Sequence, residues 1–274
     1  MNLHNLNKIS QGYQKRQQKM PVLFIGHGHP INAVLDNDFT KTLVQLGKTL
    51  EKPNGILIIS AHWETVGTYV SVNAKPRTIY DFGRFDDRLF QISYDAPGQP
   101  ELARDVKKII SMTDVMEDAD MGFDHGAWTI LKFIRPAADV PVFELSIDYT
   151  LQPHQHFALG AQLKSLRERG VLIICSGNIV HNLRLTDWYN IDAAPYEWNL
   201  EFDEQVKRHL DNRNFEGLVN YHQMGRPAML AVPTNDHYLP MLYSLGMIDK
   251  DELITHIYEG YQYASMSMRC FRIG

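Results

Sequence analysis

The chain has 274 residues, enough for one large α/β domain or two small ones, and its 44% hydrophobic and 22% charged residues are ordinary for a globular protein. A net charge of −5 without a basic block argues against a nucleic-acid partner. The apolar runs are strand-sized, and we see no charged segment followed by an apolar one at the start, so we expect neither a membrane span nor a secretory signal. With only two cysteines, Cys175 and Cys270, and no CxxC motif, we expect a reducing, cytoplasmic location.

Residues 1–20 are polar and rich in Gln, Lys and Asn. We interpret them as a disordered or loosely docked extension, because such a composition offers little apolar surface to bury. The remaining residues, 21–274, contain no break in composition that would mark a domain boundary. We therefore expect them to form a single domain.

Short apolar runs alternate with segments of helical periodicity along this domain. The runs predict strands over 22–25, 56–59, 69–72, 142–146 and 171–175, with a final pair over 253–258 and 266–273. The periodic segments predict helices over 36–50, 100–110, 126–134, 154–169 and 197–210, and another from 234 or 235 to 245. Residues 73–98 are irregular, and so long a loop inside a compact domain is usually functional. The alternation predicts an α/β fold with a central, mostly parallel or mixed sheet flanked by helices.

Three of the predicted strands end in a loop that carries a histidine. His27 follows residues 22–25, His62 follows residues 56–59, and His181 comes a few residues after 171–175. The carboxyl ends of parallel strands meet at one edge of a sheet, so these imidazoles should lie near one another. Neutral imidazole is the commonest metal ligand in proteins. The pattern predicts a metal site at the carboxyl ends of the strands.

Three further histidines are candidates for the same region. His237 lies at the predicted start of a helix, where the positive end of the helix dipole favours the neutral imidazole that a metal requires. His29 is two residues from His27, and in an extended turn their side chains diverge, so we do not expect both to bind one ion. His125 follows Asp124 at another predicted helix start, which fits either a helix cap with a surface histidine or a pocket that faces a substrate.

The other histidines lie in polar or helical contexts, and we interpret them as solvated surface residues: His4, His154, His156, His209, His222 and His256. The carboxylates near the candidate positions are Glu64, Asp81, Asp124 and Asp236, and the sequence does not single out one as a ligand. A set of histidines alone suits Zn(II) or Fe(II), and the spacing does not choose between them.

A series of motifs runs through the chain in this order: Gly26-His27-Gly28, Ser60-Ala61-His62-Trp63, Gly122-Phe123-Asp124-His125-Gly126, Ser176-Gly177-Asn178-Ile179-Val180-His181-Asn182 and Asp236-His237-Tyr238-Leu239-Pro240. The series resembles the 4,5-DOPA extradiol dioxygenase family, which belongs to the class III extradiol ring-cleavage dioxygenases. The resemblance covers essentially residues 21–274. It implies that this range is a catalytic domain that opens the ring of a DOPA-like catechol with O2.

The resemblance also implies roles for individual residues. It implies a metal bound by His27, His62 and His237, with His181 as a fourth ligand or a nearby base, and it makes His125 the histidine that meets the substrate. The metal is expected to be Fe(II) for activity, with Zn(II) as an alternative bound metal. One departure is His29, which stands where the family commonly has Ser.

Two other functions compete with this interpretation. A zinc-dependent hydrolase also uses three histidines and an activated water, although the chain lacks an H-E-x-x-H motif. A non-catalytic metal-binding scaffold of the same fold is the third possibility. The sequence indicates neither the physiological catechol nor the oligomeric state.

Overall fold

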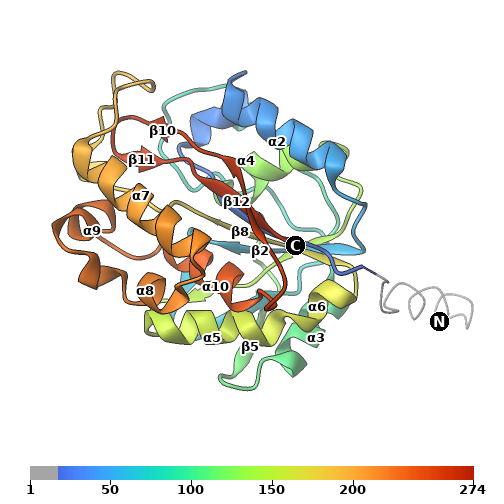
Figure 1. The fold of residues 1–274 in the computed structure, drawn as a ribbon. Coiled ribbons are helices and arrows are strands. Elements are labelled where there is room, and N and C mark those ends of the chain that lie inside the picture. The colour runs from blue at the N-terminus through green and yellow to red at the C-terminus, as the bar shows by residue number, and fades with distance from the viewer. Residues whose placement is uncertain (1–17) are drawn as a thin grey trace, which may run out of the picture.

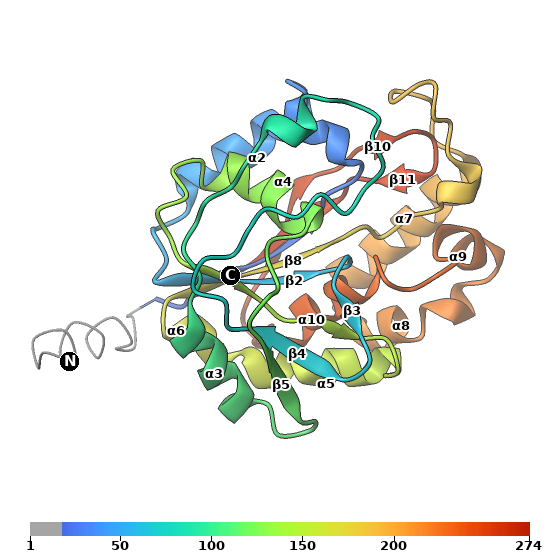
Figure 2. The same ribbon diagram turned by 180° about the vertical axis from the view of Figure 1, so that it is seen from behind.

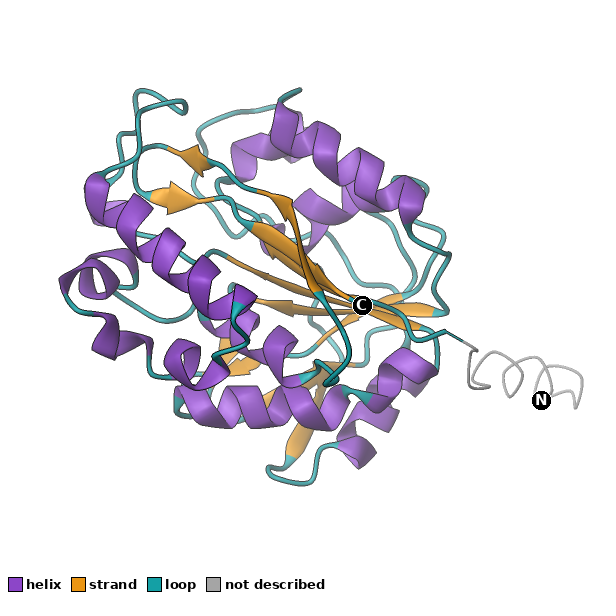
Figure 3. Cartoon of the chain, viewed as in Figure 1, coloured by secondary structure: helices purple, strands orange, loops and turns teal. Residues whose placement is uncertain are grey.

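A six-stranded sheet lies at the centre of the computed structural model, which describes residues 18–274 (Figure 3). Its order is β6-β2-β8-β1-β12-β9, in which the first four strands run parallel to one another, β12 runs antiparallel to β1, and β9 runs antiparallel to β12. The strands are β1 Val22–Gly26, β2 Gly55–Ser60, β6 Val142–Glu144, β8 Val171–Gly177, β9 Ile254–Tyr258 and β12 Cys270–Ile273. The expected α/β class with a mixed central sheet is confirmed. Of the extension predicted over 1–20, residues 1–17 lie outside the described residues, and that interpretation stays a prediction.

The three neighbouring strands β2, β8 and β1 end level with one another. Gly26 pairs with Gly177 at the end of β1, and Ser60 pairs with Ser176 at the end of β2. All three strands are buried along their whole length. Strands covered on both faces are apolar throughout rather than alternating, which is why the sequence marks them so clearly.

Helices cover both faces of the sheet (Figures 1 and 2). Two helices pack against the strand side chains of one face, namely α2 (Asp38–Thr49) and α4 (His125–Ile134). Four helices pack against those of the other face: α3 (Pro100–Ile109), α5 (Pro153–Leu163), α7 (Glu197–Asp211) and α10 (Leu239–Gly246). Each face thus has its own apolar core, and the level strand ends between the two cores are left for the loops.

Several elements differ from their predicted form. The helix expected over 154–169 is interrupted at Lys164, so α5 is followed by a separate α6 (Ser165–Glu168). The ammonium group of Lys164 donates to the carbonyl oxygen of Ile248 and to the carboxylate of Asp249. The helix expected from 234 or 235 begins only at Leu239, after a turn. The last predicted strand is divided, because Met266–Ser267 (β11) pairs with Tyr261–Gln262 (β10), while β12 pairs with β9.

Other elements were not predicted. β5 (Val115–Asp118) is mostly exposed and pairs with β4 (Thr68–Ser71), so it lacks the apolar signal of a buried strand. The segment between α7 and α10 contains three short helical pieces: α8 Phe215–Val219, η4 Tyr221–Met224 and α9 Arg226–Ala231. Two short strands, β3 Glu64–Thr65 after β2 and β7 Ile147–Asp148 after β6, pair with each other. Two 3₁₀ turns, η1 (Pro30–Val34) and η2 (Leu89–Gln91), lie in the loops near the strand ends, and the rest of 73–98 is irregular as expected.

Backbone contact between α5 and α10 depends on two glycines. A Cβ added to Gly160 would lie 2.2 Å from the carbonyl oxygen of Tyr243, and one added to Gly246 would lie 2.1 Å from that of Phe157. Real atoms do not approach so closely, so a larger residue at either position would separate the two helices.

We therefore expect Gly160→Ala to lower the free energy of unfolding by about 1–3 kcal/mol, the usual range for overpacking a core. Urea unfolding followed by circular dichroism measures it. Gly83→Ala is the matched control, because a Cβ at Gly83 would meet nothing within 4 Å. Equal stability of the Gly160 variant and the wild-type protein would contradict the close helix contact.

Candidate metal centre

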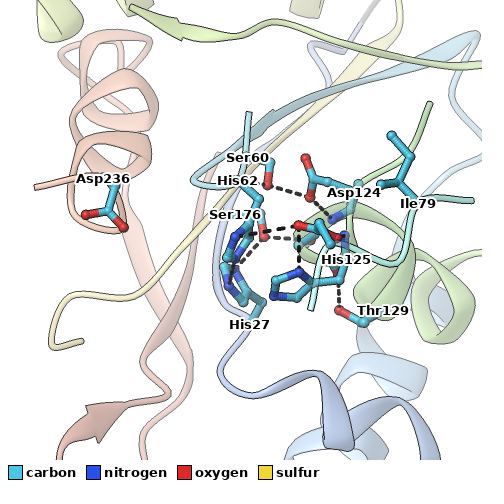
Figure 4. A network of polar contacts seen from close by, with 12 residues as sticks. His27, Ser60, His62, Ile79, Asp124, His125, Thr129, Ser176 and Asp236 are labelled. Carbon is cyan, nitrogen blue, oxygen red and sulfur yellow. Dashed lines mark hydrogen bonds and ion pairs between the residues drawn. The ribbon is translucent and has the colours of Figure 1, made fainter. Parts of the chain in front are cut away.

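The level strand ends bring His27 and His62 together. His27 directly follows β1, His62 comes two residues after the end of β2, and their Nε2 atoms are 2.9 Å apart (Figure 4). His237, in the turn before α10, completes the group: the ligand nitrogens of the three histidines lie within 4.8 Å of one another. We call this the histidine cluster. Side chains from three distant parts of the chain thus converge at the carboxyl edge of the sheet.

Hydrogen bonds on the far side of the rings decide which nitrogen faces the cluster. Ser176 Oγ donates its only proton to the Gly126 carbonyl at 2.7 Å, so His27 Nδ1, 2.9 Å from the same oxygen, must carry a proton and donate it. His237 Nδ1 donates to the Asp236 carboxylate in the same way. In His27, which burial keeps neutral, the lone pair is therefore on Nε2, and in His237 it is again Nε2 that faces the cluster.

The cluster fits a bound cation. The Nε2 atom of His237 is buried and has no hydrogen-bond partner among the described residues. Burial, and then the neighbouring imidazoles, lower the pKa of His27 and of His62 well below the usual value, so both rings are neutral. Converging ring nitrogens, two of them in neutral rings and one without a partner, are the arrangement that a metal ion satisfies.

His237 lies just outside the helix that the sequence predicts from 234 or 235. Because α10 begins at Leu239 with Tyr238 as its N-cap, His237 stands one residue before the cap, and the expected effect of the helix dipole stays a prediction. Asp236 orients the ring through Nδ1. The tight backbone approach of Gly177, where an added Cβ would lie 2.2 Å from the His237 carbonyl oxygen, holds the turn against the end of β8.

His181 lies beside the cluster. Its ring stacks on that of His237, with centroids 3.5 Å apart and planes inclined by 9°. Its ligand atom groups with Asp236 and His237 rather than with His27 and His62. Burial and the His237 ring lower the pKa of His181 well below the usual value, so this ring is also neutral. This position is compatible with a fourth ligand or with a nearby base, the two roles expected from the sequence.

His125 is the first residue of α4, and Asp81 holds it from two directions. The backbone N–H of His125 donates to Asp81 Oδ1 at 2.9 Å, and His125 Nδ1 lies 2.9 Å from Asp81 Oδ2. Burial alone would raise the pKa of Asp81, but these hydrogen bonds hold it below the usual value. The side chain of His125 is buried and lines the same cavity as the cluster, so the surface-histidine interpretation is wrong, and its position in a pocket is confirmed. That it faces a substrate stays a prediction. Asp124 caps α4, as one interpretation of the sequence held, by accepting from Ala127 N.

The cavity above the cluster has a volume of about 480 Å³, within the usual range for a small-molecule site. His29 belongs to its wall: its ring lies 4.3 Å from that of Phe85 and 5.5 Å from that of Trp188. Burial lowers the pKa of His29 to about 4. Its side chain also accepts a hydrogen bond from Ile31 N at the start of η1, and its ring nitrogens are not among the ligand atoms that group with those of His27.

The remaining histidines agree only partly with the surface interpretation. His154 and His222 are exposed, and His4 lies outside the described residues. His156 is fully buried, 3.0 Å from the hydroxyl of Tyr243, because it faces α10 from the inner side of α5; the surface interpretation is wrong there. His209 and His256 are half-buried.

Sequence reasoning missed Glu144, at the end of β6. Both of its oxygens and Asp124 Oδ2 are buried and lack a donor among the described residues. The two carboxyl groups are close enough to bond to each other, which requires a proton on one of them. Burial, and next the Asp124 charge, raise the pKa of Glu144 well above the usual value, so Glu144 carries that proton. Ser60 Oγ donates to Asp124 Oδ1 at 2.7 Å (Figure 4), which links the pair to the loop of His62. A single Glu in a short strand gives no sequence signal for this arrangement.

Comparison with known proteins adds a family match. The model of the family described as the catalytic LigB subunit of aromatic ring-opening dioxygenase matches residues 21–270. The chain is 42% identical over 265 residues to the 4,5-DOPA dioxygenase extradiol of Escherichia coli K12, covering 93% of this chain and 95% of that protein. It is 36% identical over 246 residues to the protein of the same name from Beta vulgaris, covering 86% and 91% respectively.

A solved structure has the same fold. The crystal structure of an uncharacterized protein from Escherichia coli K12 superimposes with a TM-score of 0.82 at 40% sequence identity, covering 93% of this chain and 100% of that one. Within residues 18–274, no helix is both long and apolar enough to cross a membrane.

The protonated Glu144 makes stability depend on pH. Its folded-state pKa lies above the unfolded value of about 4.3, so its contribution is complete below that pH and is lost as the pH rises through the folded-state pKa. Glu144→Gln keeps a donor for Asp124 but cannot ionise. We expect the free energy of unfolding, measured in urea between about pH 4 and pH 9, to fall less with rising pH in this variant than in the wild-type protein. The exposed Glu216→Gln is the control, and parallel curves for wild type and Glu144→Gln would contradict a shared proton.

Proposed function

Since this chain belongs to the family of the catalytic LigB subunit of aromatic ring-opening dioxygenases, and is accordingly an oxidoreductase of the extradiol type, we propose that it opens the ring of a DOPA-like catechol with O2 at a metal ion held by the histidine cluster. The proposed ligands are His27, His62 and His237, with His181 as a fourth ligand or a nearby base. We propose Fe(II) as the metal of the active enzyme and Zn(II) as an alternative bound metal. A cytoplasmic location stays our expectation from the sequence.

The observation that carries this proposal is the convergence of neutral imidazoles on the floor of a cavity with aromatic walls. In two of these rings, hydrogen bonds on the far side direct the Nε2 lone pair inward. Such outer hydrogen bonds orient metal-binding histidines and raise their basicity. The ligand set contains no carboxylate, so it would leave more positive charge on the ion than a two-histidine, one-carboxylate set does.

Iron(II) in this position would bind the catechol oxygens and dioxygen and carry the electron transfer between them. The protein has to accept the protons that the catechol loses. His125 suits this task, because it lines the cavity and its Nδ1 is taken up by Asp81, so that Nε2 is the ring nitrogen that would accept a proton. Asp81, already ionised, would stabilise the imidazolium that forms.

His181 is the second candidate for proton transfer. Its ring is neutral and stacked on that of His237, and it lines the same cavity as His125 and Phe82. The aromatic residues of the wall, with Phe82 against His125 at a ring distance of 5.5 Å, limit the access of water to these bases. Exclusion of water strengthens the electrostatic interactions on which proton transfer depends.

Substitutions should separate the ligands from the base. His27→Ala or His62→Ala should lose most of the bound metal, because each removes one of three inward-facing nitrogens, while circular dichroism shows that the fold survives. His125→Ala should keep the metal and lose turnover by about 10²–10⁴-fold, the usual span for a positioned acid or base. Metal content is measured by elemental analysis. Full metal content in the His62 variant, or loss of metal in the His125 variant, would reverse these assignments.

The reaction itself is tested with defined metals. Protein reconstituted anaerobically with Fe(II), then given air and DOPA, should consume O2 in a one-to-one ratio with substrate in an oxygen electrode and form a yellow ring-opened semialdehyde. The Zn(II) protein is the control and should consume none, because zinc has no accessible redox step. Absence of oxygen uptake by the iron-loaded protein across a panel of catechols would overturn the dioxygenase proposal.

A further inference from the structure

Among the residues from 18 to 274, Arg184 is the only Lys or Arg whose side chain lines the cavity above the histidine cluster. Two carboxylates, Asp81 and Asp236, also line it, but each already accepts a hydrogen bond from a histidine. The guanidinium group of Arg184 has no ion pair or hydrogen bond with any residue in the range 18–274. Within the described part of the chain, the cavity therefore has one exposed, charged side chain that no protein group pairs.

The histidines of the cavity are engaged in other contacts. His27 donates to Ser176, His29 accepts from Ile31 N, and the ring of His181 stacks on that of His237. The rings of His125 and His237 each lie beside a carboxylate. Among the described residues that line the cavity, Arg184 is thus the one Lys or Arg side chain, and no protein group neutralises it.

The backbone holds Arg184 close to the cluster. It lies in the 3₁₀ turn Leu183–Leu185 (η3), which follows His181 and the buried Asn182. The Asn182 side chain accepts from Arg184 N at 3.0 Å and donates to the Leu230 carbonyl at 2.7 Å, so the turn cannot shift freely. Three residues span at most about 11 Å, which places the Arg184 backbone within that distance of the His181 backbone.

Aromatic side chains occupy the wall between the cluster and solvent. Trp188 is half exposed, and its ring lies 5.5 Å from that of His29 and 5.6 Å from that of Tyr263. A catechol ring on the cluster would direct its substituent along this wall. An anionic group on that substituent would meet the unpaired guanidinium, whose planar donors match a carboxylate in a bidentate pair.

We propose that Arg184 is the specificity-determining residue of this cavity: it selects catechols whose side chain ends in an anionic group, such as a carboxylate, over neutral or cationic ones. This inference rests on the proposed function, because it takes the catechol ring to be bound at the histidine cluster. It assigns to Arg184 the recognition of the side chain, and not a part in the proton transfer or in metal binding.

The experiment compares three catechols that differ in the charge of the side chain. They are 3-(3,4-dihydroxyphenyl)propanoate, its neutral methyl ester and the cationic dopamine. For the Fe(II) protein, kcat/KM for the acid should exceed that for the ester by about 10-fold or more, as expected for a hydrogen bond to a charged group, with dopamine lowest. The preference should lie mainly in KM, since the contact is made equally before and during the reaction.

Substitutions at Arg184 should change this order. Arg184→Gln should bring the ratio of acid to ester close to one, Arg184→Lys should keep part of it, and Arg184→Glu should invert it in favour of dopamine. Arg226→Gln, at an exposed arginine of α9 that does not line the cavity, is the matched control and should keep the wild-type ratio. A wild-type ratio of acid to ester in Arg184→Gln would overturn the proposal.

A binding measurement distinguishes failure of this inference from failure of the proposed function. If the iron-loaded protein cleaves none of the three catechols, the dioxygenase proposal is overturned, and calorimetric titration of the Zn(II) protein with the acid and the ester then decides the role of Arg184. Tighter binding of the acid in the wild-type protein, lost in Arg184→Gln, supports the selection of an anionic group. Equal binding of acid and ester by the wild-type protein overturns it.

Discussion

The structure depends on burying several imidazoles at one edge of a sheet. At these separations, protonated rings would repel one another and each would lose its hydration, and burial lowers the pKa of His27 and His62 well below the usual value. A neutral imidazole has one N–H and one lone pair, so a partner outside the cluster has to accept a hydrogen bond from the N–H. Ser176 accepts this hydrogen bond from His27, and Asp81 and Asp236 lie at the corresponding ring nitrogen of His125 and His237.

The scaffold supplies these partners from the same strand ends that carry the histidines. Ser60 and Ser176 pair with each other across β2 and β8. Ser60 donates a hydrogen bond to Asp124, which caps α4, and Ser176 donates one to the carbonyl group of Gly126 within α4. Through Ser60 and Asp124, the protonated Glu144 at the end of β6 belongs to the same network. The network extends across the carboxyl edge of the parallel strands, so the positions of the imidazoles and the packing of α4 are set together.

The cavity combines this rigid floor with a wall of different character. The floor is made of buried residues at strand and helix ends, whereas the wall includes the half-exposed side chains of Phe85 and Trp188 and the exposed η3 turn. The proposed metal binding, which needs fixed geometry, thus lies at the edge of the sheet. The proposed recognition of the substrate's side chain lies on loops, where the sequence can change without disturbing the core.

The sequence by itself determined the α/β class, the buried strands that carry His27 and His62, and the family, because apolar runs and ordered motifs are local signals that need no knowledge of contacts. Only the tertiary structure decided that His156 is buried, that His237 precedes its helix, and that Arg184 has no partner among the described residues. It also decided the pairing of Glu144 with Asp124. These properties depend on contacts between residues that are distant in the sequence, on the proton that two carboxyl groups share, and on the burial that shifts a pKa. The residues next to a position along the chain contain no information about such contacts.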